Sequence, residues 1–277
     1  MSQPLVSVII PTYNHQRYII ECVDSVLNQT FTNTQIIIIN DGSKDDTDRI
    51  IKDFLVQKQH LNIEYYSKAN EGLCKTINFG LTKSKGDYVA VLASDDIWQK
   101  NKLEKQIDFL EKNSMIGLVY SDAFIIKGVT KTDIKYSDYK PKLNYYFKNS
   151  IQNIDIYKSL LTENFVLATT VVLRKSVIED IGFFDESIPI EDFDMWLRIS
   201  KKYPFGYIDL PLAYYRVHDT NMSNNTMLMI KGTAKTISKH LKNEPYKGKI
   251  FKSLFVLIRF YLTALKNRIK KHKKFKR

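Results

Sequence analysis

Two groups of acidic residues in this chain have a spacing that could support chemistry. Asp95 and Asp96 are adjacent and follow a run of apolar residues that ends at Leu92. Neighbouring carboxylates repel each other unless a cation joins them, and oxygen ligands suit Mg²⁺ or Mn²⁺. A divalent ion bound there could bridge a diphosphate. The alternative interpretation is a pair of acids near a helix start, where the helix dipole favours negative charge.

The second acidic group, Glu191, Asp192 and Asp194, precedes an amphipathic stretch of helical length. A carboxylate placed there near a sugar hydroxyl could act as a general base, because it could take the hydroxyl proton as that oxygen attacks a donor carbon. The same pattern also fits an ordinary helix N-terminus with acidic residues in its first turn.

Asp41 and His218 are further candidates for ligand binding. Asp41 directly follows an apolar run, and its carboxylate could accept the N3 hydrogen of a uracil ring. With the Gly and Ser that follow it, Asp41 also fits a plain turn before a helix. His218 lies two positions after Arg216, and both side chains could face a phosphate or a metal ion, although a single histidine is more often a surface residue.

Four short apolar runs alternate with amphipathic stretches in the first hundred residues, a pattern that predicts an α/β fold with a mostly parallel sheet. The predicted strands are residues 5–10, 35–39, 63–66 and 88–92, and the predicted helices are 17–27, 45–56 and 73–81. Ligands bind beyond the carboxyl ends of such strands. We therefore expect a polar cleft formed by the residues after the four runs, namely Pro11-Thr12-Tyr13-Asn14, Asn40-Asp41-Gly42-Ser43, Asn70-Glu71-Gly72 and Ala93-Ser94-Asp95-Asp96.

The pattern is less regular after residue 96. We predict helices over 101–112 and 193–201, strands over 116–126 and 168–173, one or two strands over 205–217, and a polar loop over 130–150. We predict three parts, residues 1–96, residues 97–220 and a helical basic tail over 221–277. The family resemblance given below implies that the first part binds a nucleotide sugar and that the second binds the acceptor and carries the catalytic residues.

The formal net charge of +12 lies entirely in the residues after Glu244, which include twelve basic residues and no acidic one. The apolar run within the tail is too short to span a bilayer. Its mixture of apolar and basic residues favours a helix in the membrane interface, near anionic lipids, over the alternative of a helix packed on the protein's own core. A nucleic-acid-binding scaffold would leave the carboxylate-lined cleft unexplained, since carboxylates repel phosphate. Cys22 and Cys74 form neither a disulfide framework nor a zinc motif.

Taken in order, these segments resemble the family 2 glycosyltransferases of the GT-A fold, of the bacterial polysaccharide or O-antigen type, which are inverting enzymes that use nucleotide sugars. The resemblance covers roughly residues 5–220. The matching segments are Val6-Ser7-Val8-Ile9-Ile10-Pro11-Thr12-Tyr13-Asn14, Asn40-Asp41-Gly42-Ser43, Asn70-x-Gly72 through Asn78-x-Gly80, Ala93-Ser94-Asp95-Asp96, Glu191-Asp192 and Tyr215-Arg216-Val217-His218.

The resemblance implies a role for each matching segment. Donor contacts come from Pro11, Thr12, Tyr13, Asn14, Asp41, Asn70, Gly72, Asn78, Ser94 and Asp95, and metal contacts come from Asp95, Asp96 and His218. Asp192 is the implied base, with Glu191 beside it. Ala93 occupies the first acidic position of the family's Asp-x-Asp motif, which leaves Asp95 as the principal metal carboxylate. Ile77 stands where many relatives have an arginine, whose contact Lys75 could supply.

The expected activity is that of a metal-dependent hexosyl- or N-acetylhexosaminyltransferase that uses Mn²⁺ or Mg²⁺. It would move a sugar from a nucleotide sugar, most simply a UDP-sugar, to a hydroxyl of a lipid-linked glycan in surface polysaccharide biosynthesis. We expect a cytoplasmic protein, peripheral on the inner face of the cell membrane and without a nucleic-acid partner. A nucleotidyltransferase would need a Gly-rich basic phosphate loop after the first strand, and this chain has none there. A catalytically inactive relative remains an alternative.

Overall fold

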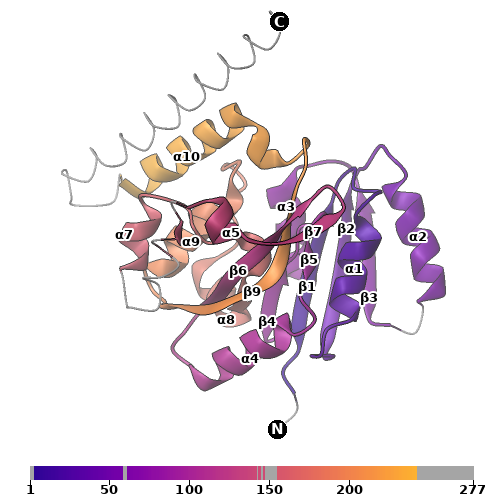
Figure 1. Cartoon of the computed structure of the whole chain (residues 1–277), viewed down its shortest axis with the longest axis horizontal. Coiled ribbons are helices and arrows are strands. Elements are labelled where there is room, and N and C mark those ends of the chain that lie inside the picture. The colour runs from indigo at the N-terminus through magenta and orange to yellow at the C-terminus, as the bar shows by residue number, and fades with distance from the viewer. Residues whose placement is uncertain (1–2, 59–60, 142, 145, 147–154, 242–277) are drawn as a thin grey trace, which may run out of the picture.

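The computed structural model of the chain describes residues 3–58, 61–141, 143–144, 146 and 155–241. Within these residues one sheet runs through the molecule in the strand order β3-β2-β1-β4-β8-β6-β9-β5, and β7 pairs with β6 outside this path. Helices flank both faces of the sheet, as Figure 1 shows.

The first half of the chain builds a parallel sheet. β1 (Val6–Thr12) lies between β2 (Thr34–Asp41) and β4 (Tyr88–Val91), and β3 (Ile63–Lys68) pairs with β2. Every residue of β1 is buried, so this strand is covered on both faces, whereas the residues of β3 are only partly buried or exposed. The carboxyl ends of β1 to β3 all lie at the upper edge of the sheet in Figure 1.

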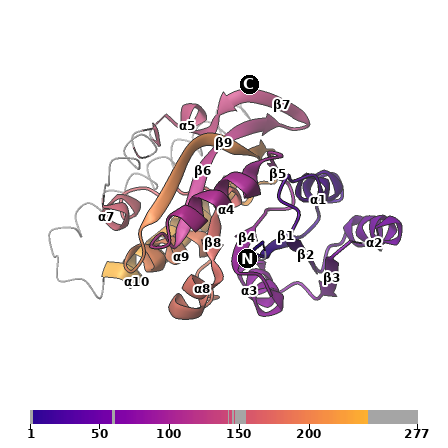
Figure 2. The same cartoon turned by 90° about the horizontal axis from the view of Figure 1, so that it is seen from below.

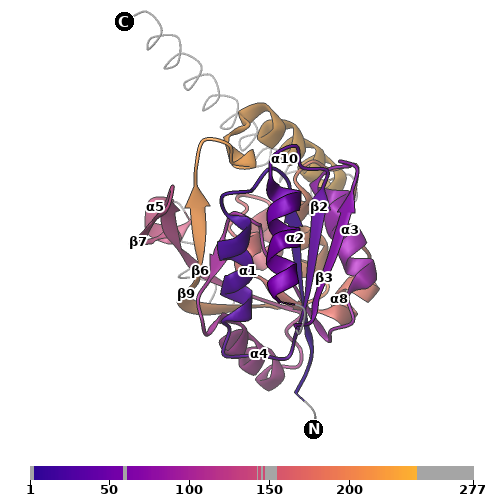
Figure 3. The same ribbon diagram turned by 90° about the vertical axis from the view of Figure 1, so that its right-hand side faces the viewer.

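Three helices cover this half of the sheet from opposite sides, as Figures 2 and 3 show. α1 (Ile19–Leu27) and α2 (Thr47–Gln57) pack their apolar residues on one face, against Val8 and Ile10. α3 (Leu73–Lys83) packs on the other face, against Ile9 and Ile39. Because neighbouring strand residues point to opposite faces, the two sets of isoleucines and valines enter two separate cores.

The second half adds antiparallel and mixed pairs. β8 (Val172–Arg174) is antiparallel to β4 and β6 (Leu118–Lys127), whereas β9 (Phe205–Val217) runs parallel to β6 and pairs with the short β5 (Ile97–Trp98). The helices here are α4 (Lys102–Lys112), α7 (Ile156–Leu160), α8 (Lys175–Ile181), α9 (Glu191–Ser200) and α10 (Thr226–Leu241). Short 3₁₀ turns span Ala168–Thr170 (η1) and Met222–Asn224 (η2).

Two predicted elements differ from those observed, and for a third the structure decides between the two predicted alternatives. The predicted polar loop contains β7 (Thr130–Lys135) and the single-turn helix α5 (Tyr136–Tyr139). The strand predicted over 168–173 begins as η1 and becomes β8 only at Val172. β9 is one continuous strand, in which the pairing with β6 shifts register next to Pro211, because proline cannot donate a ladder hydrogen bond.

The helical tail is only partly described. α10 falls within the predicted helical segment 221–277, whereas residues 242–277, which carry the predicted membrane contacts, lie outside the described residues. Among the helices that the structure describes, none has the length and apolar character needed to cross a bilayer.

Candidate active site

Asp41 ends β2 and is held by the segment that begins α3. Its Oδ1 accepts hydrogen bonds from the Glu71 backbone N–H at 3.0 Å and the Lys68 ammonium at 2.5 Å, and its Oδ2 accepts one from the Gly72 N–H at 2.9 Å. Burial alone would raise the pKa of Asp41, but these donors lower it below its usual value. Asp41 is therefore an ionised carboxylate fixed at the carboxyl end of its strand.

The turn after β1 lies beside the Asp41 segment. Asn14 has a positive φ of 55°, and its side-chain oxygen accepts the Lys44 backbone N–H at 2.7 Å, so that the turns after β1 and β2 are joined. Thr12, at the end of β1, is buried, and its hydroxyl has no hydrogen-bond partner among the described residues. Tyr13, by contrast, is exposed. Asn70 donates to the backbone oxygen of Asp41 at 2.9 Å.

Asp95 meets two histidines from other parts of the chain. His15, Asp95 and His218 each offer one possible metal-ligand atom, and these three atoms lie within 4.8 Å of one another. The Nε2 of His218 is 2.9 Å from Oδ2 of Asp95. His15 follows β1, which pairs with β4, and Asp95 lies between β4 and β5, which pairs with β9 just ahead of His218. These two pairings bring the three side chains together. Two imidazoles and a carboxylate are groups that can hold a divalent metal ion.

The protonation states of these groups also favour cation binding. Burial lowers the pKa of His15 below its usual value, which keeps its imidazole neutral and its nitrogen lone pair available. Burial alone would raise the pKa of Asp95, but the hydrogen bond with His218 lowers it below its usual value.

The Asp96 side chain is bonded outside the cluster of His15, Asp95 and His218. Its Oδ1 accepts the backbone N–H of Arg216 at 2.8 Å, and it is not among the three clustered groups. Burial, reinforced by the negative charge of Asp95, raises the pKa of Asp96 well above its usual value. The prediction that Asp96 is a metal ligand therefore gains no support from this geometry.

Arg216 is a fully buried cation behind the cluster. It donates to the backbone oxygen of Asp95 at 2.6 Å and to the Glu21 carboxylate at 2.7 Å, and its guanidinium lies 4.7 Å from the ring centre of Tyr18. Arg216 thus fixes the backbone from which Asp95 projects, rather than offering a free charge to a phosphate.

Glu191 and Asp192 form the first turn of α9. Burial raises the pKa of Glu191 to about 8, with the neighbouring charge of Asp192 adding to the effect, and burial raises the pKa of Asp192 to about 6. Both residues line a small cavity whose other walls are apolar, including Ile77, Phe184 and Trp196. A carboxyl group whose pKa is moved toward neutrality can accept and release protons near pH 7.

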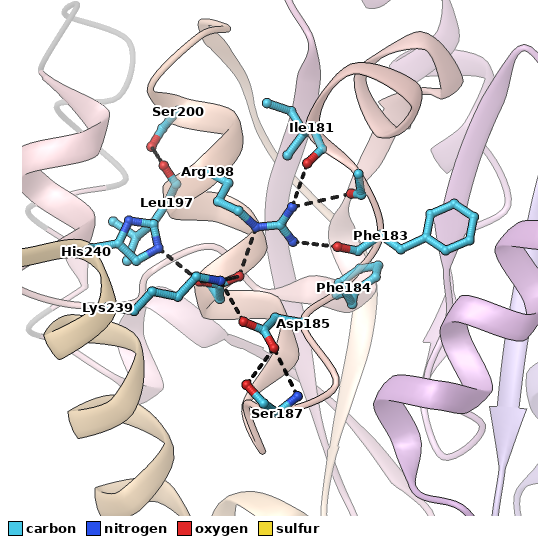
Figure 4. A network of polar contacts seen from close by, with 12 residues as sticks. Ile181, Phe183, Phe184, Asp185, Ser187, Leu197, Arg198, Ser200, Lys239 and His240 are labelled. Atoms are coloured by element: carbon cyan, nitrogen blue, oxygen red, sulfur yellow. Dashed lines mark hydrogen bonds and ion pairs between the residues drawn. The ribbon is translucent and has the colours of Figure 1, made fainter. Parts of the chain in front are cut away.

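A polar network behind α9 fixes this helix to its neighbours, as Figure 4 shows. Asp194, whose side chain is completely buried, accepts hydrogen bonds from Arg198 at 2.9 Å, from Lys239 at 3.0 Å and from His240 Nε2 at 2.9 Å. The last two residues belong to α10. Burial alone would raise the pKa of Asp194, but the hydrogen bonds from His240 and Lys239 lower it.

Hydrogen bonds from Arg198 and Lys239 also hold the segment between α8 and α9. Arg198 donates to the backbone oxygens of Ile181 and Phe183, and Lys239 donates to Asp185 at 2.7 Å. The amide of Asn78 donates to the Phe184 oxygen at 3.0 Å and accepts the Phe184 N–H at 3.0 Å. Asn78 was predicted to contact the donor, but here its amide holds the segment that leads into α9.

Known proteins with similar sequences identify the class of enzyme. The family described as "Glycosyl transferase family 2" matches residues 7–182. The chain belongs to this family. An uncharacterized glycosyltransferase of Rickettsia typhi is 34% identical over 228 residues, which cover 81% of this chain and 67% of that protein. One from Methanocaldococcus jannaschii is 30% identical over 274 residues, covering 95% and 91% of the two chains. A relative from Rickettsia felis is 32% identical, but this chain spans only 34% of its length.

Solved glycosyltransferase structures share the fold. Staphylococcus aureus TarS (residues 1–349) in complex with UDP-GlcNAc aligns with a TM-score of 0.67 and 20% identity, covering 92% of this chain and 71% of TarS. The Pyrobaculum calidifontis mannosyltransferase PcManGT, in complex with GDP-Man and Mn²⁺, aligns with a TM-score of 0.68 and 15% identity, covering 95% and 76%. The predicted GT-A type of α/β fold is thereby confirmed, and this family 2 member is a glycosyltransferase.

Proposed function

We propose that this glycosyltransferase transfers a hexosyl or N-acetylhexosaminyl group from a nucleotide sugar, most simply a UDP-sugar, to a hydroxyl group of a lipid-linked glycan, with inversion at the anomeric carbon. The observation that carries the proposal is the arrangement at the carboxyl ends of the strands. A fixed anion at Asp41 and the cluster of His15, Asp95 and His218 lie there, and two carboxyls of raised pKa begin α9.

The donor's nucleotide would lie over the ends of β1 and β2. A carboxylate has about four acceptor positions. Asp41 accepts hydrogen bonds from Lys68, Glu71 and Gly72, and the Thr76 side chain also lies within range, so the N3 hydrogen of uracil would compete for the remaining position. The buried hydroxyl of Thr12, with no partner among the described residues, could complete its hydrogen bonding with the same ligand. The complexes of TarS with UDP and UDP-GlcNAc support a uridine nucleotide as the first to test.

A divalent cation would be held by Asp95 and His218, and Asp96 follows Asp95 in the sequence. When bound, Mn²⁺ or Mg²⁺ would supply positive charge to the leaving diphosphate. The side chains fit such an ion, because the structure gathers a carboxylate and imidazoles of suitable spacing. The Mn²⁺ complex of PcManGT supports the choice of metal.

Asp192 would be the general base and Glu191 its neighbour in the same turn. Asp192 would take the proton from the acceptor hydroxyl while that oxygen attacks the anomeric carbon from the face opposite the nucleotide. Its carboxyl accepts a long hydrogen bond of 3.5 Å from the Asn164 amide, and the Phe193 backbone N–H also lies within range, which leaves acceptor positions for a substrate hydroxyl.

An aromatic pair extends between the two parts of the site. The rings of Tyr136 and Tyr215 pack edge to face at 5.3 Å. Burial raises the pKa of both tyrosines, and the charge of Asp192 adds to the effect at Tyr136 while that of Asp95 adds to it at Tyr215. The packed rings and the effect of both charges on their pKa values support an acceptor site beside this pair.

Ligand binding tests this proposal directly. We expect UDP-sugars with Mn²⁺ to raise the unfolding temperature of the full chain more than GDP- or dTDP-sugars do. A ligand at about a hundred times its Kd adds roughly 2.7 kcal/mol of apparent stability. Asp95→Ala should remove the metal-dependent part of UDP binding, whereas Asp41→Ala should weaken uridine with or without metal. A chain that responds to no nucleotide sugar would refute the proposal.

A further inference from the structure

We propose that His15 is a third protein ligand of the cation, so that two imidazoles and one carboxylate hold the metal, and that the site takes a divalent transition-metal ion such as Mn²⁺ in preference to Mg²⁺. This inference rests on the proposed function, because it concerns the cation that would act on the donor.

Three separate segments of the chain converge at this cluster. Ligand atoms of His15, Asp95 and His218 lie within 4.8 Å of one another. The two histidine rings are 6.1 Å apart and nearly perpendicular, at 88°. They therefore do not stack on each other, and both can direct a nitrogen toward the Asp95 carboxylate.

Both imidazoles are oriented by a contact between Nδ1 and a hydroxyl group. The Nδ1 of His15 is 2.7 Å from the Ser94 hydroxyl, and the Nδ1 of His218 is 2.8 Å from the Thr220 hydroxyl. Each ring therefore uses Nδ1 for a hydroxyl, and Nε2 is the nitrogen left for a metal ion, which in His218 would replace the present contact with Oδ2 of Asp95. Histidines that bind metals in proteins are fixed in the same way by a partner on the other ring nitrogen.

The Tyr18 ring packs against both imidazole rings. Its ring centre lies 5.2 Å from that of His218 and 5.9 Å from that of His15, and it in turn lies under the Arg216 guanidinium. Both imidazoles thus pack against one aromatic residue that is itself held in place, which limits the rotations that would take their nitrogens away from Asp95.

The cluster of His15, Asp95 and His218 contains few oxygen ligands. Asp95 contributes the single carboxylate of the cluster, since Oδ1 of Asp96 accepts the backbone N–H of Arg216 at 2.8 Å. Mg²⁺ prefers oxygen ligands and retains its water, whereas imidazole nitrogens suit first-row transition metals. The donor set therefore disfavours Mg²⁺. The usual order of affinities also predicts tighter binding of Co²⁺ than of Mn²⁺.

Electron paramagnetic resonance with Mn²⁺ tests the inference without relying on activity. We expect the full chain, titrated with Mn²⁺ in the presence of UDP, to show two directly coordinated imidazole nitrogens in pulsed spectra. His15→Ala should show one, with an increase in the Mn²⁺ Kd of about tenfold or more, equivalent to about 1.4 kcal/mol. Gln16→Ala is the matched control, because its side chain contacts the Asp46 backbone and no atom of the cluster.

Competition with the unchanged protein gives a second measurement. Mg²⁺ at an equal concentration should displace little Mn²⁺, and Co²⁺ should displace most of it. A single coordinated nitrogen in the unchanged chain, an unaltered Kd in His15→Ala, or equal competition by Mg²⁺ would each overturn the inference. If UDP still binds in those cases, the proposed function survives; if the chain binds neither UDP nor Mn²⁺, both fail.

Discussion

Asp192 is the residue whose replacement most directly separates chemistry from binding. The Asp192→Asn variant keeps the shape of the side chain but cannot accept the acceptor proton. We expect it to lower kcat by about 100-fold or more while the Kd of the donor changes little. Initial rates with saturating substrates and donor titrations by calorimetry measure the two quantities.

Asp180→Asn is a suitable control for this substitution, because Asp180 is an exposed aspartate of α8 paired with Lys202. It should leave both kcat and the donor Kd unchanged. If Asp192→Asn instead weakens donor binding and keeps its rate at saturation, Asp192 is a binding residue and Glu191 becomes the next candidate for the base.

The raised pKa of Asp192 predicts the acid side of the pH–rate profile. A general base works only when ionised, and burial raises the pKa of this carboxyl to about 6. We therefore expect kcat/KM to fall as the pH is lowered through about 6, well above the ordinary titration range of an aspartate. The residual activity of Asp192→Asn should lack this limb. An acid limb near pH 4 in the unchanged enzyme would contradict the assignment.

The site residues differ in how far the sequence alone could predict them. Asp95 and His218 were predicted because each follows an apolar run that ends in a polar turn, and the structure brings them together. His15 was missed because a single histidine in a turn has no spacing pattern, and its neighbours become visible only once β1 and β4 pair. Asn78 shows the converse, since a motif position can serve packing within the fold.

At the scale of the elements, the Asp194 network should make α9 dependent on α10. Asp194→Asn removes a buried charge that faces Arg198, Lys239 and His240. Breaking such a pair leaves cations without their partner, and we expect a loss of about 3 kcal/mol in the free energy of unfolding. Urea denaturation followed by circular dichroism measures it.

A matched control exists on α4, where Asp108 pairs with Lys112 at the surface. Exposed pairs of this kind contribute about 0–1 kcal/mol, so Asp108→Asn should have little effect. If the two substitutions destabilise the protein equally, the network is not a specific link between α9 and α10.

The elements that sequence patterns predicted are those with a buried face. β1, β2 and α4 have buried apolar residues at strand or helix spacing, and their positions agree closely with the prediction. β7 was predicted as loop because most of its residues are exposed, so it has no apolar face to produce an alternating pattern. Its position depends on pairing with β6, which local sequence does not encode.

At the scale of the whole molecule, the basic tail is the remaining predicted contact surface. We expect deletion of residues 246–277 to release the protein from anionic liposomes, because each Lys or Arg near such a surface contributes about 1 kcal/mol. Hydrolysis of free UDP-sugar should be largely unchanged. Cosedimentation with vesicles of defined anionic content is the measurement.

Neutral vesicles provide the control, since the full chain should bind them much more weakly. Cosedimentation that persists after the deletion, or a truncated chain that no longer folds, would replace the membrane role with a structural one.

If Asp95 is the centre of a cation site that activates a nucleotide sugar, the chain should release UDP slowly even without an acceptor. Donor-only incubation measures this release: the purified full chain is mixed with each common UDP-sugar and Mn²⁺, and UDP is followed over time. We expect slow UDP release from at least one donor, its loss when the metal is chelated, and its absence in Asp95→Ala. Release that continues at the same rate after chelation and in Asp95→Ala would contradict it.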